Sequence, residues 1–106
     1  MHRTAAGTLA IAALTAAAAL PAWGQNSNPN LGRNLAATCA NCHGTTGQSV
    51  APMPSLAGLP KDSIVSQMRD FRDGKRPATV MHQLSKGYSD EQVDLIAGHF
   101  AAQKAR

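Results

Sequence analysis

The sequence is poor in the large side chains from which hydrophobic cores are built. Its 106 residues include two phenylalanines, one tyrosine and one tryptophan, and charged residues make up only 15% of the chain. The formal net charge of +4 is mild, whereas a nucleic-acid-binding surface needs a dense basic face interleaved with aromatic side chains. So short a chain lies near the lower size limit for a domain stabilised by its core alone. We therefore expect a disulfide, a metal or another bound group to complete the fold.

Cysteine is scarce as well, since the chain contains only Cys39 and Cys42, followed directly by His43. A thioredoxin-type dithiol needs a βαβ setting, and no segment shows the alternation of apolar and polar residues that is typical of strands. A structural zinc site needs four ligands at characteristic spacings, and His82 and His99 are too far apart to form a second pair. A disulfide within C-x-x-C closes too small a loop to stabilise the chain much.

The sequence Cys39-Ala40-Asn41-Cys42-His43 has the C-x-x-C-H form that attaches c-type haem. At the end of a helix, residues three apart lie on one face, about 5–6 Å from each other. Both thiols can then add to the two vinyl groups along one edge of a haem. The next residue, His43, lies beneath the ring and can bind the iron. The sequence thus predicts one covalently bound haem.

Low-spin haem iron takes a second ligand on its other face. The candidates are the methionine and histidine side chains farther along the chain: Met53, Met68, Met81, His82 and His99. We favour Met81, which is predicted to lie in the loop 76–81, because a loop held at both ends by helices can cross the open haem face. His82 is the next choice.

The remaining three candidates are less suited to binding the iron. Met68 lies on the apolar stripe of a predicted helix, which favours a place in the core. Met53 is only ten residues beyond His43, which leaves little chain to pass around the ring edge. His99 lies next to the apolar face of the last predicted helix.

Filled axial positions favour electron transfer over catalysis, because the iron then has no place for a substrate. A thioether is a soft, neutral ligand that raises the reduction potential relative to two histidines. A haem-based gas sensor or peroxidase is a different interpretation, and it requires an open iron site. With Met81 as ligand, the sequence predicts an electron-transfer protein rather than an enzyme.

The N-terminal segment has the three parts of a secretory signal peptide. A basic start ends at Arg3, residues 4–20 carry no charge, and Ala22 and Gly24 are small residues at the spacing that signal peptidase accepts. An uncleaved anchor is the alternative, but a membrane-spanning helix needs about 20 strongly apolar residues. The uncharged run is shorter and mostly alanine.

We therefore expect residues 1–24 to be a signal peptide and residues 25–106 to be the mature domain. Cleavage leaves a periplasmic protein with no stable membrane insertion. The mature part is predicted to be all-α with long loops. Its first helix covers residues 31–39, with Asn30 at a position where it can cap the helix.

Two further helices have clearer signals. The second begins at Pro60 and ends near Gly74, which suits the left-handed conformation of a helix C-terminus. Its predicted apolar stripe consists of Ile64, Val65, Met68 and Phe71. The third begins at the capping box Ser89-Asp90-Glu91-Gln92. Its predicted buried face consists of Val93, Ile96, Ala97, Phe100 and Ala101.

With the haem motif and Met81 identified, residues 30–104 resemble a class I cytochrome c. The resemblance implies an all-α fold of about three to five helices around one haem. Pro54, Leu56 and Gly58 are similar to the P-x-L-x-G loop of the family. In that loop the Pro54 carbonyl would accept the ring N–H of His43, and Leu56 would pack on the haem.

The resemblance also implies that the first and last helices cross at a small residue, with Gly32 against Phe100. Residues 71–104 are similar to the haem subunit of flavocytochrome c sulfide dehydrogenases and to related small bacterial cytochromes. The implied partner is an FAD-containing subunit that oxidises sulfide. A freely diffusing carrier between a membrane complex and a terminal oxidase or reductase is the alternative.

Four basic residues near the end of the second predicted helix have two interpretations. They are Arg69, Arg72, Lys75 and Arg76. They form either a solvated helix end, favoured by the helix dipole, or a basic rim that contacts haem propionates and steers an acidic partner.

Overall fold

The computed structural model describes residues 28–50 and 52–105, and the predicted signal peptide lies outside them. All regular structure in these residues is helical, which confirms the predicted all-α class. The elements are α1 (Leu31–Ala36), α2 (Ala40–His43), α3 (Lys61–Arg72), α4 (Met81–Leu84), the 3-10 turn η1 (Ser85–Gly87) and α5 (Asp90–Ala101). Across the described ranges, no helix has the length and apolar character needed to span a bilayer.

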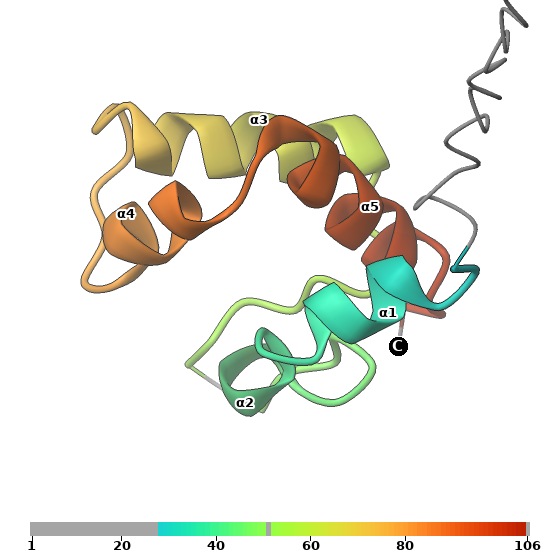
Figure 1. Cartoon of the computed structure of the whole chain (residues 1–106). Helices are drawn as coiled ribbons and strands as arrows, with labels where there is room; N and C mark the ends of the chain where they lie inside the picture. The colour runs from blue at the N-terminus through green and yellow to red at the C-terminus, as the bar shows by residue number, and fades with distance from the viewer. Residues whose placement is uncertain (1–27, 51, 106) are drawn as a thin grey trace, which may run out of the picture.

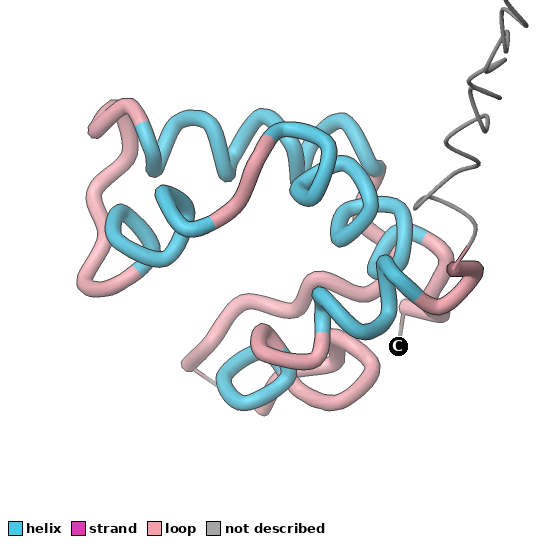
Figure 2. The backbone as a smooth tube through the Cα atoms, in the orientation of Figure 1, coloured by secondary structure: helices cyan, strands magenta, loops and turns pink. Residues whose placement is uncertain are grey.

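The helices form two layers joined at one end (Figure 1). In the first layer α3 lies beside α5 and α4, and in the second α1 leads into α2 and the loop that follows it. The layers meet where α1 packs against α5. Figure 2 shows that α2 is a short turn followed by a long loop, whereas α4 follows a loop and continues directly into η1.

Helix α5 begins at the predicted capping box. The Gln92 backbone N–H donates to Ser89 Oγ (3.2 Å), and the Ser89 N–H donates to Gln92 Oε1 (2.9 Å). These bonds satisfy amide groups that a helix N-terminus leaves without partners. The predicted buried face is confirmed for Val93, Ile96, Ala97 and Phe100, whereas Ala101 is only half-buried.

Helix α3 also follows its prediction, and Gly74 ends it with a φ of 72°. Ile64 is buried, and Val65 and Met68 pack against the core beside it. Phe71 differs from the prediction because the Arg76 guanidinium lies 4.9 Å from the centre of its ring. The ring is half-buried under this cation and contributes to a surface cation–π contact rather than to the core cluster.

The first predicted helix is split in two. Helix α1 ends at Ala36 and α2 starts at Ala40, with a turn between them. Asn30 occupies the N-cap position but makes no side-chain capping bond. Instead, the carbonyl oxygen of Asn28 accepts the Leu31 N–H (3.0 Å).

The contact between α1 and α5 also corrects the prediction. A Cβ atom on Gly32 would lie 2.8 Å from the carbonyl oxygen of Leu95, so Gly32 faces Leu95 rather than Phe100. Phe100 packs instead against Gly47, whose added Cβ would lie 2.7 Å from the Phe100 ring. Gly47 has a φ of 78°, which favours glycine. The loop after α2 is therefore anchored on α5.

The core is small. Its fully buried apolar residues include three alanines, and Phe100 is its one buried aromatic ring among the described residues: Ala36, Ala57, Ile64, Val93, Ile96, Ala97 and Phe100. Such a core removes little apolar surface from water, and the hydrophobic free energy scales with that surface. The fold thus has the shortage of apolar burial that the composition predicts.

Candidate functional site

Helix α2 consists of the last four residues of the C-x-x-C-H segment, and Cys39 is its N-cap. The Cys39 carbonyl oxygen accepts the N–H groups of Cys42 (3.2 Å) and His43 (2.9 Å), which winds one tight turn between the cysteines. Both thiols are free; Cys39 is half-buried and Cys42 is exposed. Burial raises the pKa of the Cys39 thiol above its ordinary value. The turn therefore presents two unoxidised sulfur atoms three residues apart, as double thioether attachment requires.

His43 is held in one orientation. Its side chain is buried, with 8% of its surface exposed, and Nδ1 lies 2.7 Å from the carbonyl oxygen of Pro54. A carbonyl can only accept, so Nδ1 carries a proton, and in the neutral imidazole Nε2 is then the nitrogen with the lone pair. This is the contact that the cytochrome resemblance implies. The role of His43 as an iron ligand stays a prediction.

The Pro54–Gly58 segment is fixed by the loop around it. Gly47 accepts hydrogen bonds from the N–H groups of Leu56 (2.7 Å) and Ala57 (3.1 Å), and the Gly58 N–H donates to the carbonyl of Phe100 (3.0 Å). Leu56 is half-buried and packs against the core cluster. The backbone of Pro54 is thereby positioned by α5 as well as by its own loop.

Met81 is the first residue of α4, which corrects the expectation that it lies in an irregular loop. The other candidate iron ligands lie in different surroundings. Met68 packs against the core, and the His99 ring lies edge-on to Phe100 with centroids 5.3 Å apart. His82 is half-buried, and its Nδ1 has no hydrogen-bond partner in the described part of the chain. Met53 is 47% exposed.

The surroundings of the predicted ligands fit a haem. Val80 and Leu84, which flank Met81 along the chain, are each 52% exposed, and Met53 next to Pro54 is almost as open. Large apolar side chains at this exposure are costly unless something covers them. The flat apolar faces of a porphyrin would do so. In Figure 1, α2 and α4 lie on the same side of the α1–α5 contact, one in each layer.

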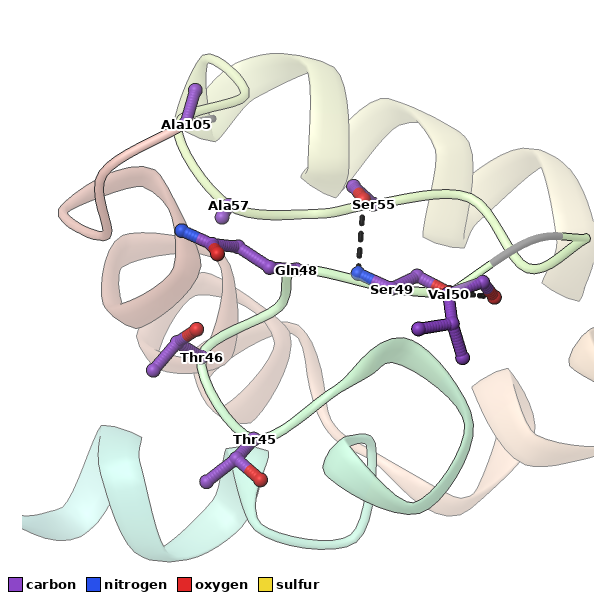
Figure 3. A pocket seen from close by; sticks show the side chains of 8 residues that line it. All are labelled: Thr45, Thr46, Gln48, Ser49, Val50, Ser55, Ala57 and Ala105. Atoms are coloured by element: carbon purple, nitrogen blue, oxygen red, sulfur yellow. Dashed lines mark hydrogen bonds between the residues drawn. The ribbon is translucent and has the colours of Figure 1, made fainter.

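A separate hollow of about 430 Å³ lies beside the loop after α2, near Ala105 close to the C-terminus (Figure 3). It is lined by small and polar residues: Thr45, Thr46, Gln48, Ser49, Val50, Ser55, Ala57 and Ala105. The Ser49 N–H donates across it to Ser55 Oγ (2.9 Å). None of the predicted cofactor-binding residues lines this hollow, so it is distinct from the candidate haem site.

Three of the four basic residues are engaged within the protein. Arg72 donates to Asp90 (2.6 Å) and to the carbonyl oxygen of Tyr88 (3.0 Å). Arg76 donates to Gln67 (2.6 Å) besides covering Phe71. These arginines stabilise the α3–α5 layer, and the exposed Lys75 pairs with Asp73 (3.7 Å). Among the described contacts, the basic-rim interpretation is therefore left mainly with Arg69.

No group of three or more histidine, cysteine, aspartate or glutamate side chains within residues 28–50 and 52–105 could hold a metal ion. The cysteine pair is thus not part of a larger cluster of such donors there. The site consists of a two-thiol turn, an oriented imidazole and uncovered apolar side chains beside a methionine.

Comparison with known proteins decides the family, because the cytochrome c profile matches residues 29–100. The chain belongs to the cytochrome c family. It is therefore an electron carrier that holds covalent haem c. Family membership alone fixes neither the number of haems nor the identity of the iron ligands. Membership confirms the predicted cytochrome c fold.

Several characterised relatives are similar in sequence. The cytochrome subunit of sulfide dehydrogenase from Chlorobaculum tepidum is 42% identical over 65% of this chain and 63% of its own length. Cytochrome c4 from Pseudomonas aeruginosa is 43% identical over 69% of this chain and 37% of its own length. The match thus spans less than two thirds of either relative. Cytochrome c-554(548) from Halomonas halodenitrificans is 36% identical, and 93% of its length is matched.

A solved structure supports the same fold. Cytochrome c4 from Acidithiobacillus ferrooxidans superposes with a TM-score of 0.62 at 27% identity, covering 68% of this chain and 49% of that chain. Together with the family match, this similarity shows that the two helical layers are a cytochrome c arrangement.

One contact near the site was not predicted from the sequence. Thr38 and Tyr88, 50 positions apart, are joined by a side-chain hydrogen bond of 2.7 Å. Tyr88 directly precedes the capping box, at the position of a hydrophobic staple. No sequence motif pairs residues at such a separation.

Proposed function

We propose that Cys39 and Cys42 hold a single haem c through thioether bonds, with His43 and Met81 as its axial iron ligands. The observation that carries this proposal is the 2.7 Å hydrogen bond from His43 Nδ1 to the Pro54 carbonyl. It supports the proposal because it selects the neutral tautomer with the lone pair on Nε2 and orients the ring, as a ligating histidine requires.

The haem, when bound, supplies the one-electron redox chemistry. The residues of the chain determine how it is used. His43 and Met81 fill both axial positions, so that substrate has no coordination site. The neutral sulfur of Met81 stabilises ferrous iron and raises the potential. Leu56, Val80 and Leu84 exclude water from the faces of the ring, which favours outer-sphere electron transfer.

The electron donor in this proposal is the flavoprotein subunit of a sulfide-oxidising enzyme. The supporting observation is the 42% identity to the cytochrome subunit of sulfide dehydrogenase from Chlorobaculum tepidum. The protein accepts electrons one at a time in the periplasm, after removal of residues 1–24. Arg69, and Lys75 once it leaves its exposed ion pair with Asp73, are the basic side chains available to meet an acidic partner.

A freely diffusing carrier between a membrane complex and a terminal oxidase or reductase is the second candidate. It is favoured by the match to cytochrome c-554(548), because the aligned region covers 93% of that protein. In that relative, a region similar to this chain makes up almost the whole cytochrome.

Purification of the untagged protein from the native periplasm distinguishes the two candidates. Stoichiometric co-purification of a flavoprotein, together with sulfide-dependent reduction of the haem, supports the first. A monomer that only other cytochromes reduce supports the second and contradicts the first. Determination of the N-terminal residue of the same sample is expected to give Gln25.

A further inference from the structure

A side-chain hydrogen bond joins the segment that begins with Met81 to the segment that contains C-x-x-C-H. Thr38 Oγ1 and the Tyr88 hydroxyl lie 2.7 Å apart. Thr38 directly precedes Cys39, and Tyr88 directly follows the continuous run of α4 and η1. This hydrogen bond therefore connects the segment that carries His43 with the segment that carries Met81, in addition to any connection through iron.

The donor in this bond follows from a second contact of Thr38. Its Oγ1 also lies 3.2 Å from the carbonyl oxygen of Leu35, which can only accept. A threonine hydroxyl has one proton. Thr38 therefore donates to Leu35 and accepts from Tyr88. Replacing Tyr88 by phenylalanine removes this donor and keeps the ring.

The backbone of Tyr88 is fixed independently of its side chain. Arg72 Nη2 in α3 donates to the Tyr88 carbonyl oxygen (3.0 Å), while Arg72 Nη1 donates to Asp90 in α5 (2.6 Å). The next residue, Ser89, belongs to the capping box. Tyr88 is therefore an anchored residue of the α3–α5 layer whose hydroxyl reaches the α1–α2 segment.

We propose that the Thr38–Tyr88 hydrogen bond is a latch that holds the α1–α2 segment against the layer that carries α4, and so holds Met81 on the iron. The inference rests on the proposed His43 and Met81 ligation. Release of Met81 requires the layer that carries α4 to move away from the segment that carries His43. A bond between these segments adds to the free energy of that opening. Tyr88 and Thr38 are positioning residues, because they act on the iron only by holding Met81 in place.

The latch can be measured by competition with an external ligand. Imidazole binds the ferric iron only after Met81 has left, so its apparent dissociation constant depends on the population of the open form. The ferric holoprotein is titrated with imidazole while the charge-transfer band of thioether ligation is followed. Tyr88→Phe is expected to lower the apparent dissociation constant about three- to tenfold, the range for one neutral hydrogen bond.

Thr38→Val tests the other end of the same bond, and it is expected to shift the dissociation constant in the same direction. The double variant is expected to bind imidazole no more tightly than the stronger single variant, because both substitutions break one interaction. Additive effects of the two substitutions would mean that they act separately, and would contradict the latch.

Ser89→Ala is the matched control. It removes the cap of α5 next to Tyr88 and lowers overall stability, but it leaves the Thr38–Tyr88 bond. We expect a lower unfolding midpoint with an unchanged imidazole dissociation constant. If Ser89→Ala strengthens imidazole binding as much as Tyr88→Phe does, the effect reflects general stability and the latch is wrong.

The outcomes separate the latch from the proposed function. A wild-type protein without the thioether band overturns the Met81 ligation and the latch together. A wild-type protein with the band, whose imidazole affinity is unchanged by Tyr88→Phe, overturns the latch alone.

Discussion

The α3–α5 layer and the α2–α4 side of the molecule differ in how far protein contacts alone account for their stability. Helices α3 and α5 have 12 residues each, and α5 has a complete capping box. The two helices are joined by ion pairs between Lys61 and Asp94 (2.7 Å) and between Arg72 and Asp90 (2.6 Å). This layer contains most of the buried core.

Helices α2 and α4 have four residues each, far below the length at which an isolated helix is stable in water. Apolar side chains beside them, such as Val80 and Leu84, are half exposed. The contrast indicates that the α3–α5 layer is specified by its own sequence, whereas the site side needs the haem to bury its apolar surface.

Removal of the haem is the largest expected effect. A chain with Cys39→Ala and Cys42→Ala cannot form the thioether bonds. We expect the haem-free protein to lose its cooperative thermal unfolding transition and its near-ultraviolet circular dichroism, because the porphyrin supplies much of the apolar interior. Far-ultraviolet circular dichroism is expected to keep some helical signal from α3 and α5. A cooperative transition in the haem-free chain would refute the contrast between the two sides.

Met81→Ala is expected to abolish the ferric charge-transfer band of thioether ligation and to open the ferrous iron to carbon monoxide. Met68→Leu is the control, since Met68 packs against the core, and it should keep the band. Both effects are read by absorption spectroscopy. Survival of the band in Met81→Ala would transfer the ligand role to Met53 or Met68.

Gly32→Ala tests the junction between the two layers. The added Cβ would lie 2.8 Å from the Leu95 carbonyl oxygen, and overpacking of this kind costs about 1–3 kcal/mol of unfolding free energy. Gly98→Ala in α5 is the matched control, because its Cβ would have nothing nearer than Lys61 Cε at 3.9 Å.

Alanine in the open position of α5 is expected to be neutral or to stabilise by up to about 1 kcal/mol. Urea unfolding of the two holoproteins measures the difference. Equal stability of the two variants would show that α1 and α5 are packed less tightly than the close approach of Gly32 to the Leu95 carbonyl oxygen indicates.

Asp90→Asn is expected to have the smallest effect: a small loss of stability near neutral pH that disappears as the pH falls into the acid range. The hydrogen bond and charge of Arg72 hold the pKa of Asp90 below its ordinary value of 3.8. A carboxyl group with a depressed folded pKa contributes stability above its unfolded pKa, and loses it as pH falls through the folded value.

The stability of the wild type should therefore fall more steeply than that of Asp90→Asn as pH drops below about 4. Thermal unfolding of both proteins across this range measures the slopes. The difference should shrink at high salt, because the carboxylate is exposed and its charge is screened. Parallel slopes at low salt would contradict a role for the Arg72 pair in this layer.

The parts of the fold that were predicted from the sequence are those with local signals. The capping box at Ser89 and the glycine at position 74 depend on neighbouring residues, and both are observed at their predicted helix ends. The haem motif is local too, since Cys39 to His43 form one turn.

The parts that the sequence did not predict depend on contacts between distant residues. The break between α1 and α2 comes where Thr38 donates to the Leu35 carbonyl and meets Tyr88. Gly32 faces Leu95 because of the angle at which two helices cross, and a sequence pattern does not contain that angle. Helix α4 is one turn long, too short for a hydrophobic period to be recognised.

Peptide mapping of the purified native protein tests the central claim most directly. Tryptic cleavage after Arg33 and Lys61 releases residues 34–61, which contain both cysteines and His43. After acid–acetone extraction, mass spectrometry is expected to find one haem attached to this peptide through two thioether bonds. Unmodified Cys39 and Cys42 in a colourless, folded protein would contradict the account.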